Sequence, residues 1–112
     1  MTHPMLLAWS SPVSVERDAE FNEWYVGTHI PEIRQAIPGI TAVQRYRVLG
    51  SGSADTPTRY VCCYELGGTD VASAAKALGE ARAAGAFTPS DSMDVSSAPP
   101  DLKFVEPDGE IG

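Results

Sequence analysis

Four stretches of the chain carry the apolar, branched and aromatic residues that are typical of β-strands. Residues 40–49, ITAVQRYRVL, alternate between two faces, and residues 59–66, RYVCCYEL, follow after the loop-like segment GSGSADTP. These two strands are expected to form an antiparallel hairpin with a long connection. An early strand is predicted at Met5–Ser10, between prolines, and a last strand at residues 102–106.

The longest helical pattern begins near residue 15 or 16 and ends at Ile37, before a Pro-Gly pair. Ser14 is suited to cap its first turn, and acidic residues follow near the positive end of the helix dipole. Pro31 lies inside the pattern, where it lacks an N–H donor and its ring would clash with the carbonyl group of Gly27. We therefore expect a kink or a restart of the helix between Gly27 and Pro31.

A second helix is predicted at residues 71–84, which are mostly alanine, with Leu78 as the one large apolar anchor. Thr69 or Asp70 can cap its start, and Gly85 is a suitable stop. The order strand, helix, strand, strand, helix, strand predicts an α+β, ferredoxin-like βαββαβ fold, with a four-stranded antiparallel sheet and both helices on one face. Residues 1–112 are enough for a single domain of this kind.

The charge balance bears on the partners of the protein. The chain has 8 basic and 15 acidic residues and a net charge of -7, which opposes attraction to nucleic acid or to anionic lipid. Its apolar runs are far too short to span a membrane, and its first residues do not resemble a signal peptide, so a cytoplasmic protein is expected. Cys62 and Cys63 are adjacent and lack metal-ligand spacing, which favours two small buried hydrophobic residues.

Candidate chemistry is concentrated in the first helix, FNEWYVGTHIPEIRQAI. At helical spacing Asn22, Tyr25 and His29 form one stripe inside the apolar face, and Asp18 extends it. His29 is suited to be an acid or base near neutral pH, with Tyr25 and Asn22 as donors to a developing negative charge. The alternative is a hydrogen-bonded core or capping histidine. Flat apolar walls for a small ligand would come from three aromatic residues, although each of these is also a normal core residue: Trp9, Trp24 and Tyr46.

The segment EFNEWYVGTHIPEI, followed by PGI and QRYRVL, resembles the EthD-like family of the dimeric α+β barrel superfamily. The resemblance covers about residues 20–49 by motif and the whole chain by the order of its elements. It implies an EthD-like domain over residues 1–112, a homodimer whose sheets form a barrel, and a ligand cavity between the sheet and the helices. Related barrels include cyclases, isomerases, lyases, monooxygenases and haem enzymes, so the fold does not fix a reaction.

A homodimer is also expected because the strands are apolar on both faces while the helices cover only one. Arg45 and Arg47 share a strand face that should meet the dimer partner or the barrel edge. There one of them is expected to pair with a carboxylate across the sheet or the dimer, and the alternative is recognition of an anionic group on a ligand.

Three functions remain open at this point. The first is cofactor-free proton transfer on a small apolar or aromatic carbonyl compound, as in a cyclase, isomerase or lyase, with His29 as the acid/base. The second is a non-catalytic binding or accessory module in which His29 only hydrogen-bonds a ligand. The third is a cofactor-independent monooxygenase. No cofactor and no metal are expected, because no phosphate-binding loop, nucleophile elbow or metal-ligand motif is present.

Overall fold

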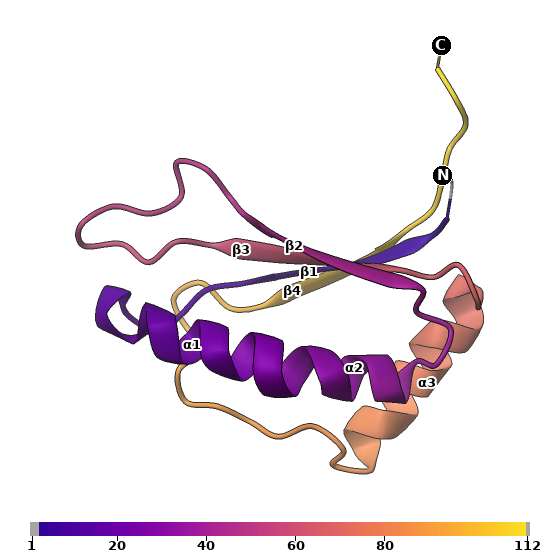
Figure 1. Ribbon diagram of the computed structural model, residues 1–112, viewed down its shortest axis with the longest axis horizontal. Coiled ribbons are helices and arrows are strands. Elements are labelled where there is room, and N and C mark those ends of the chain that lie inside the picture. The colour runs from indigo at the N-terminus through magenta and orange to yellow at the C-terminus, as the bar shows by residue number, and fades with distance from the viewer. Residues whose placement is uncertain (1–2, 112) are drawn as a thin grey trace.

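The computed structural model describes residues 3–111 and contains one antiparallel sheet with helices on one of its faces (Figure 1). The strands lie in the order β2-β3-β1-β4. Their bounds are β1 Met5–Ser10, β2 Ala42–Arg47, β3 Tyr60–Glu65 and β4 Asp101–Val105. The ferredoxin-like prediction is therefore confirmed.

The predicted ends of the strands differ from the observed ends by at most two residues, and the largest difference is at β2. The Thr41 amide still donates to the Glu65 carbonyl oxygen at 2.9 Å, and the Val48 amide donates to the Arg59 carbonyl oxygen at 2.8 Å. Hydrogen bonding between the strands thus continues by one residue beyond each end of β2.

The first helical region is made of four consecutive segments, and the predicted kink is absent. These are η1 Val15–Arg17, α1 Asp18–Trp24, the single π-helical turn η2 Tyr25–His29, and α2 Ile30–Ala36. Figure 1 shows α1 and α2 as one continuous helix. The Ile30 amide donates to the carbonyl oxygen of Tyr25, five residues earlier, and Pro31 lies in the first turn of α2. A π-helical turn is an alternative to a bend where a proline interrupts the regular hydrogen bonding of a helix, and here the helix widens and does not bend.

Helix α3 Val71–Ala83 begins at the predicted residue and ends one residue earlier than predicted. The Asp70 carboxylate accepts a hydrogen bond from the Ser73 amide at 2.7 Å, which caps the first turn. Gly85 has φ +70°, a left-handed conformation that favours glycine at the end of a helix. Between α3 and β4 the chain runs through residues 86–100, a segment without helix or strand that we call the strap (Figure 1).

The core lies between the sheet and the helices. Strand register places Leu6 opposite Tyr64 and Ala8 opposite Cys62, and these side chains are buried against the helices. Phe21 and Tyr25 pack onto them from α1 and η2, with exposed fractions of 0% and 2%. Since each strand alternates its side chains, the residues between these positions must lie on the opposite, uncovered face.

The uncovered face of the sheet is rich in apolar side chains. Trp9 lies opposite Val61, which lies opposite Tyr46, and Tyr46 is 52% exposed. The same face also carries Met5, Leu7, Cys63 and Val105. An apolar sheet face of this size is a common site of protein association, so the homodimer remains our prediction.

Arg45 does not lie on this face, which corrects the sequence-based expectation. It pairs with Cys62 in the register, and Cys62 is buried under the helices. Neither Arg45 nor Arg47 forms an ion pair with any of residues 3–111, so the expected pairing with a carboxylate within the chain is also absent.

No helix among residues 3–111 combines the length and the hydrophobicity that a membrane span needs.

We predict that the uncovered sheet face mediates homodimer formation. Sedimentation of the wild-type protein at micromolar concentration should give about twice the chain mass of 11.9 kDa. Val61→Glu places a charge between Trp9 and Tyr46 and should shift the protein to the monomer, because burying an unpaired carboxylate is costly.

The matched control is Val26→Glu, since Val26 is 56% exposed on the helical side. This variant should remain a dimer. A wild-type protein that sediments as a monomer would contradict the prediction.

Candidate functional site

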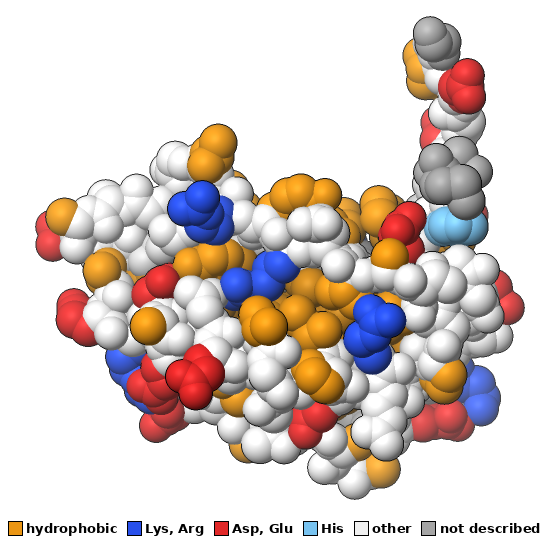
Figure 2. All heavy atoms as spheres, in the orientation of Figure 1, with side chains coloured by type: hydrophobic (Ala, Val, Ile, Leu, Met, Phe, Trp, Pro, Cys, Tyr) orange, Lys and Arg blue, Asp and Glu red, His pale blue; other side chains and the backbone are white. Residues whose placement is uncertain are grey.

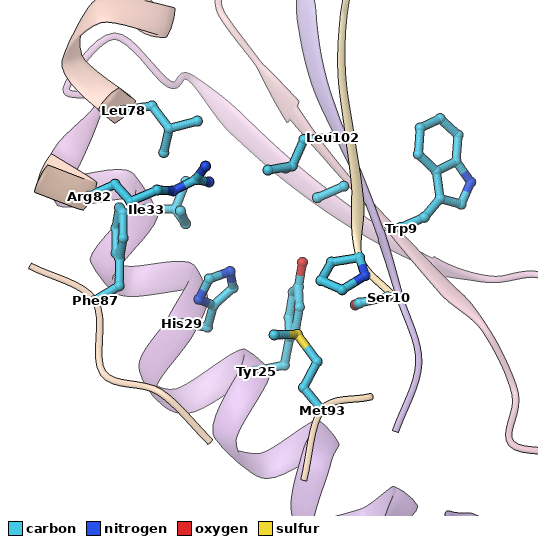
Figure 3. Close-up of a pocket in the computed structure, with 12 residues that line it drawn as sticks. Trp9, Ser10, Tyr25, His29, Ile33, Leu78, Arg82, Phe87, Met93 and Leu102 are labelled. Atoms are coloured by element: carbon cyan, nitrogen blue, oxygen red, sulfur yellow. The ribbon is translucent and has the colours of Figure 1, made fainter. Parts of the chain in front are cut away.

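A cavity of about 130 Å³ lies between the sheet, the first helical region, α3 and the strap (Figure 3). It is enclosed mainly by apolar side chains, and its polar groups are few. The lining residues are Ala8, Trp9, Ser10, Tyr25, His29, Ile33, Leu78, Arg82, Phe87, Met93, Pro100 and Leu102.

His29 projects from the last position of the π-helical turn into this cavity (Figure 3). Its imidazole stacks on Trp24, with ring centroids 4.9 Å apart, and also contacts Tyr25 at 4.8 Å. Phe87 of the strap lies 6.3 Å away on the same centroid measure. Residues five apart become neighbours only where a helix widens, so the π-helical turn is what allows Trp24 and Tyr25 to contact His29 together.

The surroundings of His29 favour its neutral form. Burial among aromatic rings lowers the pKa of His29 below its ordinary value of 6.5. The carboxylate of Glu32 opposes this effect and the guanidinium of Arg82 adds to it. The Nδ1 atom of His29 is buried and has no hydrogen-bond partner among the described residues. A neutral imidazole with an unpaired nitrogen is able to accept or donate a proton.

The sheet side of the cavity supplies two hydroxyl groups. Figure 3 shows the phenol of Tyr25 reaching from the helix toward the strands, with its oxygen turned toward Ser10. Burial raises the pKa of Tyr25 to about 12, so this group is a neutral donor. The Oγ atom of Ser10 is buried, has no partner among the described residues, and belongs to a residue that is 3% exposed.

The strap covers the cavity, and Thr88 attaches it to the part of the first helical region that borders the cavity. The carboxylate of Glu32 accepts hydrogen bonds from the Thr88 amide at 2.8 Å and from the Thr88 hydroxyl at 2.7 Å. The indole nitrogen of Trp24 donates to the Thr88 carbonyl oxygen at 3.1 Å. Trp24 is not among the residues that line the cavity. Its indole ring stacks on His29, and its indole nitrogen is hydrogen-bonded to the strap, so Trp24 links the two.

Asn22 lies outside the cavity, so the prediction that Asn22, Tyr25 and His29 border one cavity is wrong for Asn22. Its amide nitrogen donates to Asp18 at 3.0 Å and to the Tyr60 hydroxyl at 3.2 Å. The three residues do follow one stripe, but seven helical residues rise roughly 10 Å along the axis, which is too far for one small cavity.

The two remaining predicted residues also point elsewhere. Trp9 borders the cavity on the sheet side, but Figure 3 shows its indole turned away from the enclosed space. Tyr46 lies on the uncovered face of the sheet, together with Met5 and Cys63. Strand alternation explains both positions, because each residue lies between neighbours whose side chains face the helices.

Sequence reasoning missed a second polar cluster, formed by Asp18, Asn22, Arg45 and Tyr60. The Tyr60 hydroxyl donates to Asp18 at 2.7 Å, and the Arg45 guanidinium lies 4.1 Å from the centre of the Tyr60 ring. Arg45 also lies 4.7 Å from the ring centre of Tyr25, on which His29 rests. The alternation of residues 40–49 placed Arg45 on a defined strand face, but not under the helices.

Sequence reasoning also missed Ser10 and Arg82, which line the cavity from the end of β1 and from the last turn of α3. No local motif marks either residue. No group of three or more His, Cys, Asp or Glu residues is placed to hold a metal ion within residues 3–111.

These features describe an α+β protein with a ferredoxin-like fold and an enclosed, mainly apolar cavity. No family model and no curated protein matches the sequence. An EthD-like protein from Ralstonia eutropha JMP134 superposes with a TM-score of 0.51 at 12% identity, covering 95% of this chain and 93% of its own. A Streptomyces coelicolor monooxygenase from the gene ActVA-Orf6, in complex with nanaomycin D, has a TM-score of 0.49 at 15% identity, covering 98% and 91%. The chain thus has the fold of an EthD-like protein, as its sequence motif predicted.

We predict that the lowered pKa of His29 makes the free energy of unfolding depend on pH. Below about pH 6.5 the unfolded chain binds a proton at His29 that the folded chain resists, so the free energy of unfolding should fall as the pH falls. His29→Asn should remove part of the difference between urea unfolding at pH 7.5 and at pH 5.5.

The matched control is His3→Asn, at the other histidine of the chain, which lies outside the cavity. A loss of pH dependence in this variant equal to that in His29→Asn would show that the effect is not specific to His29. An equal pH dependence in wild-type protein and His29→Asn would show that His29 is not held neutral.

Proposed function

We propose that this protein binds a small apolar or aromatic molecule with an oxygen substituent in the cavity, and that His29 transfers a proton on it. One observation supports this most strongly: Ser10 Oγ and His29 Nδ1, both from cavity-lining residues, are buried polar atoms without partners in the described chain. An unpaired buried polar group costs roughly 1–3 kcal/mol, which a ligand with a complementary oxygen would offset.

The size of the cavity supports a ligand with one ring. Its volume of about 130 Å³ is similar to the roughly 150 Å³ of an engineered apolar cavity that holds benzene. Ile33, Leu78 and Met93 would contact the apolar part of the ligand. Its oxygen would then lie at the sheet side, near Tyr25 and Ser10.

Proton transfer follows from the same arrangement. A hydrogen bond from Tyr25 to the carbonyl oxygen of the ligand makes the protons on the carbon next to the carbonyl group more acidic. The neutral His29 then removes one of these protons, and the electron pair of the broken C–H bond moves toward the oxygen to form the enolate. The enolate oxygen is stabilised by the hydroxyl, and the imidazolium returns the proton to a second position or a leaving group. Cyclisation, isomerisation and elimination all begin with this step.

A dimeric α+β barrel is part of the proposal. Two copies would pack through the uncovered sheet faces, and each would keep its own cavity on the far side of its sheet. A non-catalytic binding module would use the same cavity without the proton transfer, so binding and catalysis need separate experiments.

We predict that the Tyr25 hydroxyl contributes to binding of a phenol or ketone. Tyr25→Phe should weaken binding of 4-methylphenol, followed by NMR titration, by roughly 0.5–1.5 kcal/mol, the net value of one hydrogen bond. Tyr46→Phe is the matched control, because Tyr46 lies on the uncovered face. Equal affinities in both variants would contradict the proposed position of the oxygen.

We predict that His29 catalyses proton exchange on a ketone. The probe is 2-indanone in D₂O, whose protons next to the carbonyl exchange for deuterium by the enolisation described above. Wild-type protein should accelerate the exchange, and His29→Ala should lower the rate roughly 10²- to 10⁴-fold.

The thermal midpoint of His29→Ala must be measured beside the rate, since loss of folded protein would also lower it. If wild-type protein binds 2-indanone without accelerating exchange, the cavity belongs to a binding module. If a folded His29→Ala retains the full rate, His29 is a core residue.

A further inference from the structure

Arg82 is the one cation among the residues that line the cavity. It lies in the last turn of α3, and Figure 3 shows its guanidinium turned toward the space above His29, between Leu78 and Ile33. The residue as a whole is exposed, so this end of the cavity borders the surface of the protein. The hydroxyls of Tyr25 and Ser10 lie at the opposite, sheet end, and the two ends of the cavity therefore differ in chemistry.

No carboxylate of residues 3–111 pairs with Arg82. Two acidic residues of α2 and α3 have other partners. Glu32 accepts both of its hydrogen bonds from Thr88, and Glu80 pairs with Lys76 at 2.8 Å. Several other arginines of the chain also lack an ion pair, and Arg82 differs from them in its position, because it lies beside an apolar cavity.

We propose that the ligand of this cavity is an aromatic or cyclic carboxylic acid, whose carboxylate pairs with Arg82 while its oxygen substituent reaches Tyr25 and Ser10. This inference rests on the proposed function and names the substrate class of the same site. A planar guanidinium can bind a carboxylate through two parallel hydrogen bonds, and a partly enclosed position strengthens them. Because the net charge of the chain is -7, long-range attraction does not favour an anion, and binding of one would depend on a local cation such as Arg82.

The geometry also gives the carboxylate a role in the reaction. His29 lies between the two ends, beneath the guanidinium and beside Tyr25 (Figure 3). A ligand anchored at both ends would present its middle carbons to the imidazole. Arg82 would then act as a positioning and specificity residue, without taking part in proton transfer.

The test uses two probes of nearly equal shape that differ in charge, 4-hydroxybenzoate and 4-hydroxybenzamide. Affinities are measured by NMR titration of the full chain at pH 7. Wild-type protein should bind the acid roughly tenfold more tightly than the amide, as expected for one charge-assisted pair. Arg82→Gln should reduce this ratio to about one by weakening only the acid, and Arg82→Lys should restore part of it.

The matched control is Arg34→Gln, which removes the same charge from an exposed residue of α2 outside the cavity. It should keep the wild-type ratio. Equal binding of the two probes by wild-type protein, or a preference that survives in Arg82→Gln, would overturn the inference and leave the proposed function standing. Binding of neither probe would contradict both.

Discussion

The widened turn at Tyr25–His29 is the constraint on which the candidate site depends. A proline at position 31 cannot continue a regular α-helix without conflict with the preceding turn, and the chain resolves the conflict by adding one residue to that turn. The adjustment keeps α1 and α2 collinear, so both can pack along the sheet. It also brings Trp24 and Tyr25 into contact with the same imidazole, that of His29. In a regular α-helix only Tyr25, four residues before His29, would be its neighbour.

The polar groups under the helices fall into two clusters, which differ in how many hydrogen bonds their side chains form with one another. At the α1 end, Asp18, Asn22 and Tyr60 form hydrogen bonds with one another. At the cavity end, buried atoms of Ser10 and His29 have no protein partner in the described chain. Tyr25 lies between the clusters, in contact with Arg45 on one ring face and with His29. Buried atoms without a partner in the described chain also occur at the α1 end, at Asn22 Oδ1 and at two guanidinium nitrogens of Arg45. The unpaired atoms of Ser10 and His29 differ from these because their residues line the cavity, where a ligand can supply the partners.

Much of the fold follows from local sequence, and the exceptions have physical causes. Alternation and the turn residues predict the strands, their order of connection and the α3 boundaries, because these depend on short-range rules. The sequence also marks Tyr25 and His29, since both sit on an apolar helical face. It does not give the route around Pro31, because a kink and a wide turn relieve the same clash. Nor does it give Arg82 or Ser10, which reach the cavity only through packing of α3 and β1, or the contact of Thr88 with Glu32 across 56 positions.

The strap has a consequence for how proteins of this shape diverge. It supplies Phe87, Met93 and Pro100 to the cavity, yet it contributes no strand to the sheet and no helix to the core. Arg17 and Arg59 hold it through Asp91 and through the carbonyl oxygens of Ala98 and Pro99. Substitutions or length changes between such attachment points alter the cavity wall at little cost to the register of the strands. Selection can therefore change which molecules fit while the scaffold persists, and related chains with little sequence in common can share this architecture and differ in what they bind.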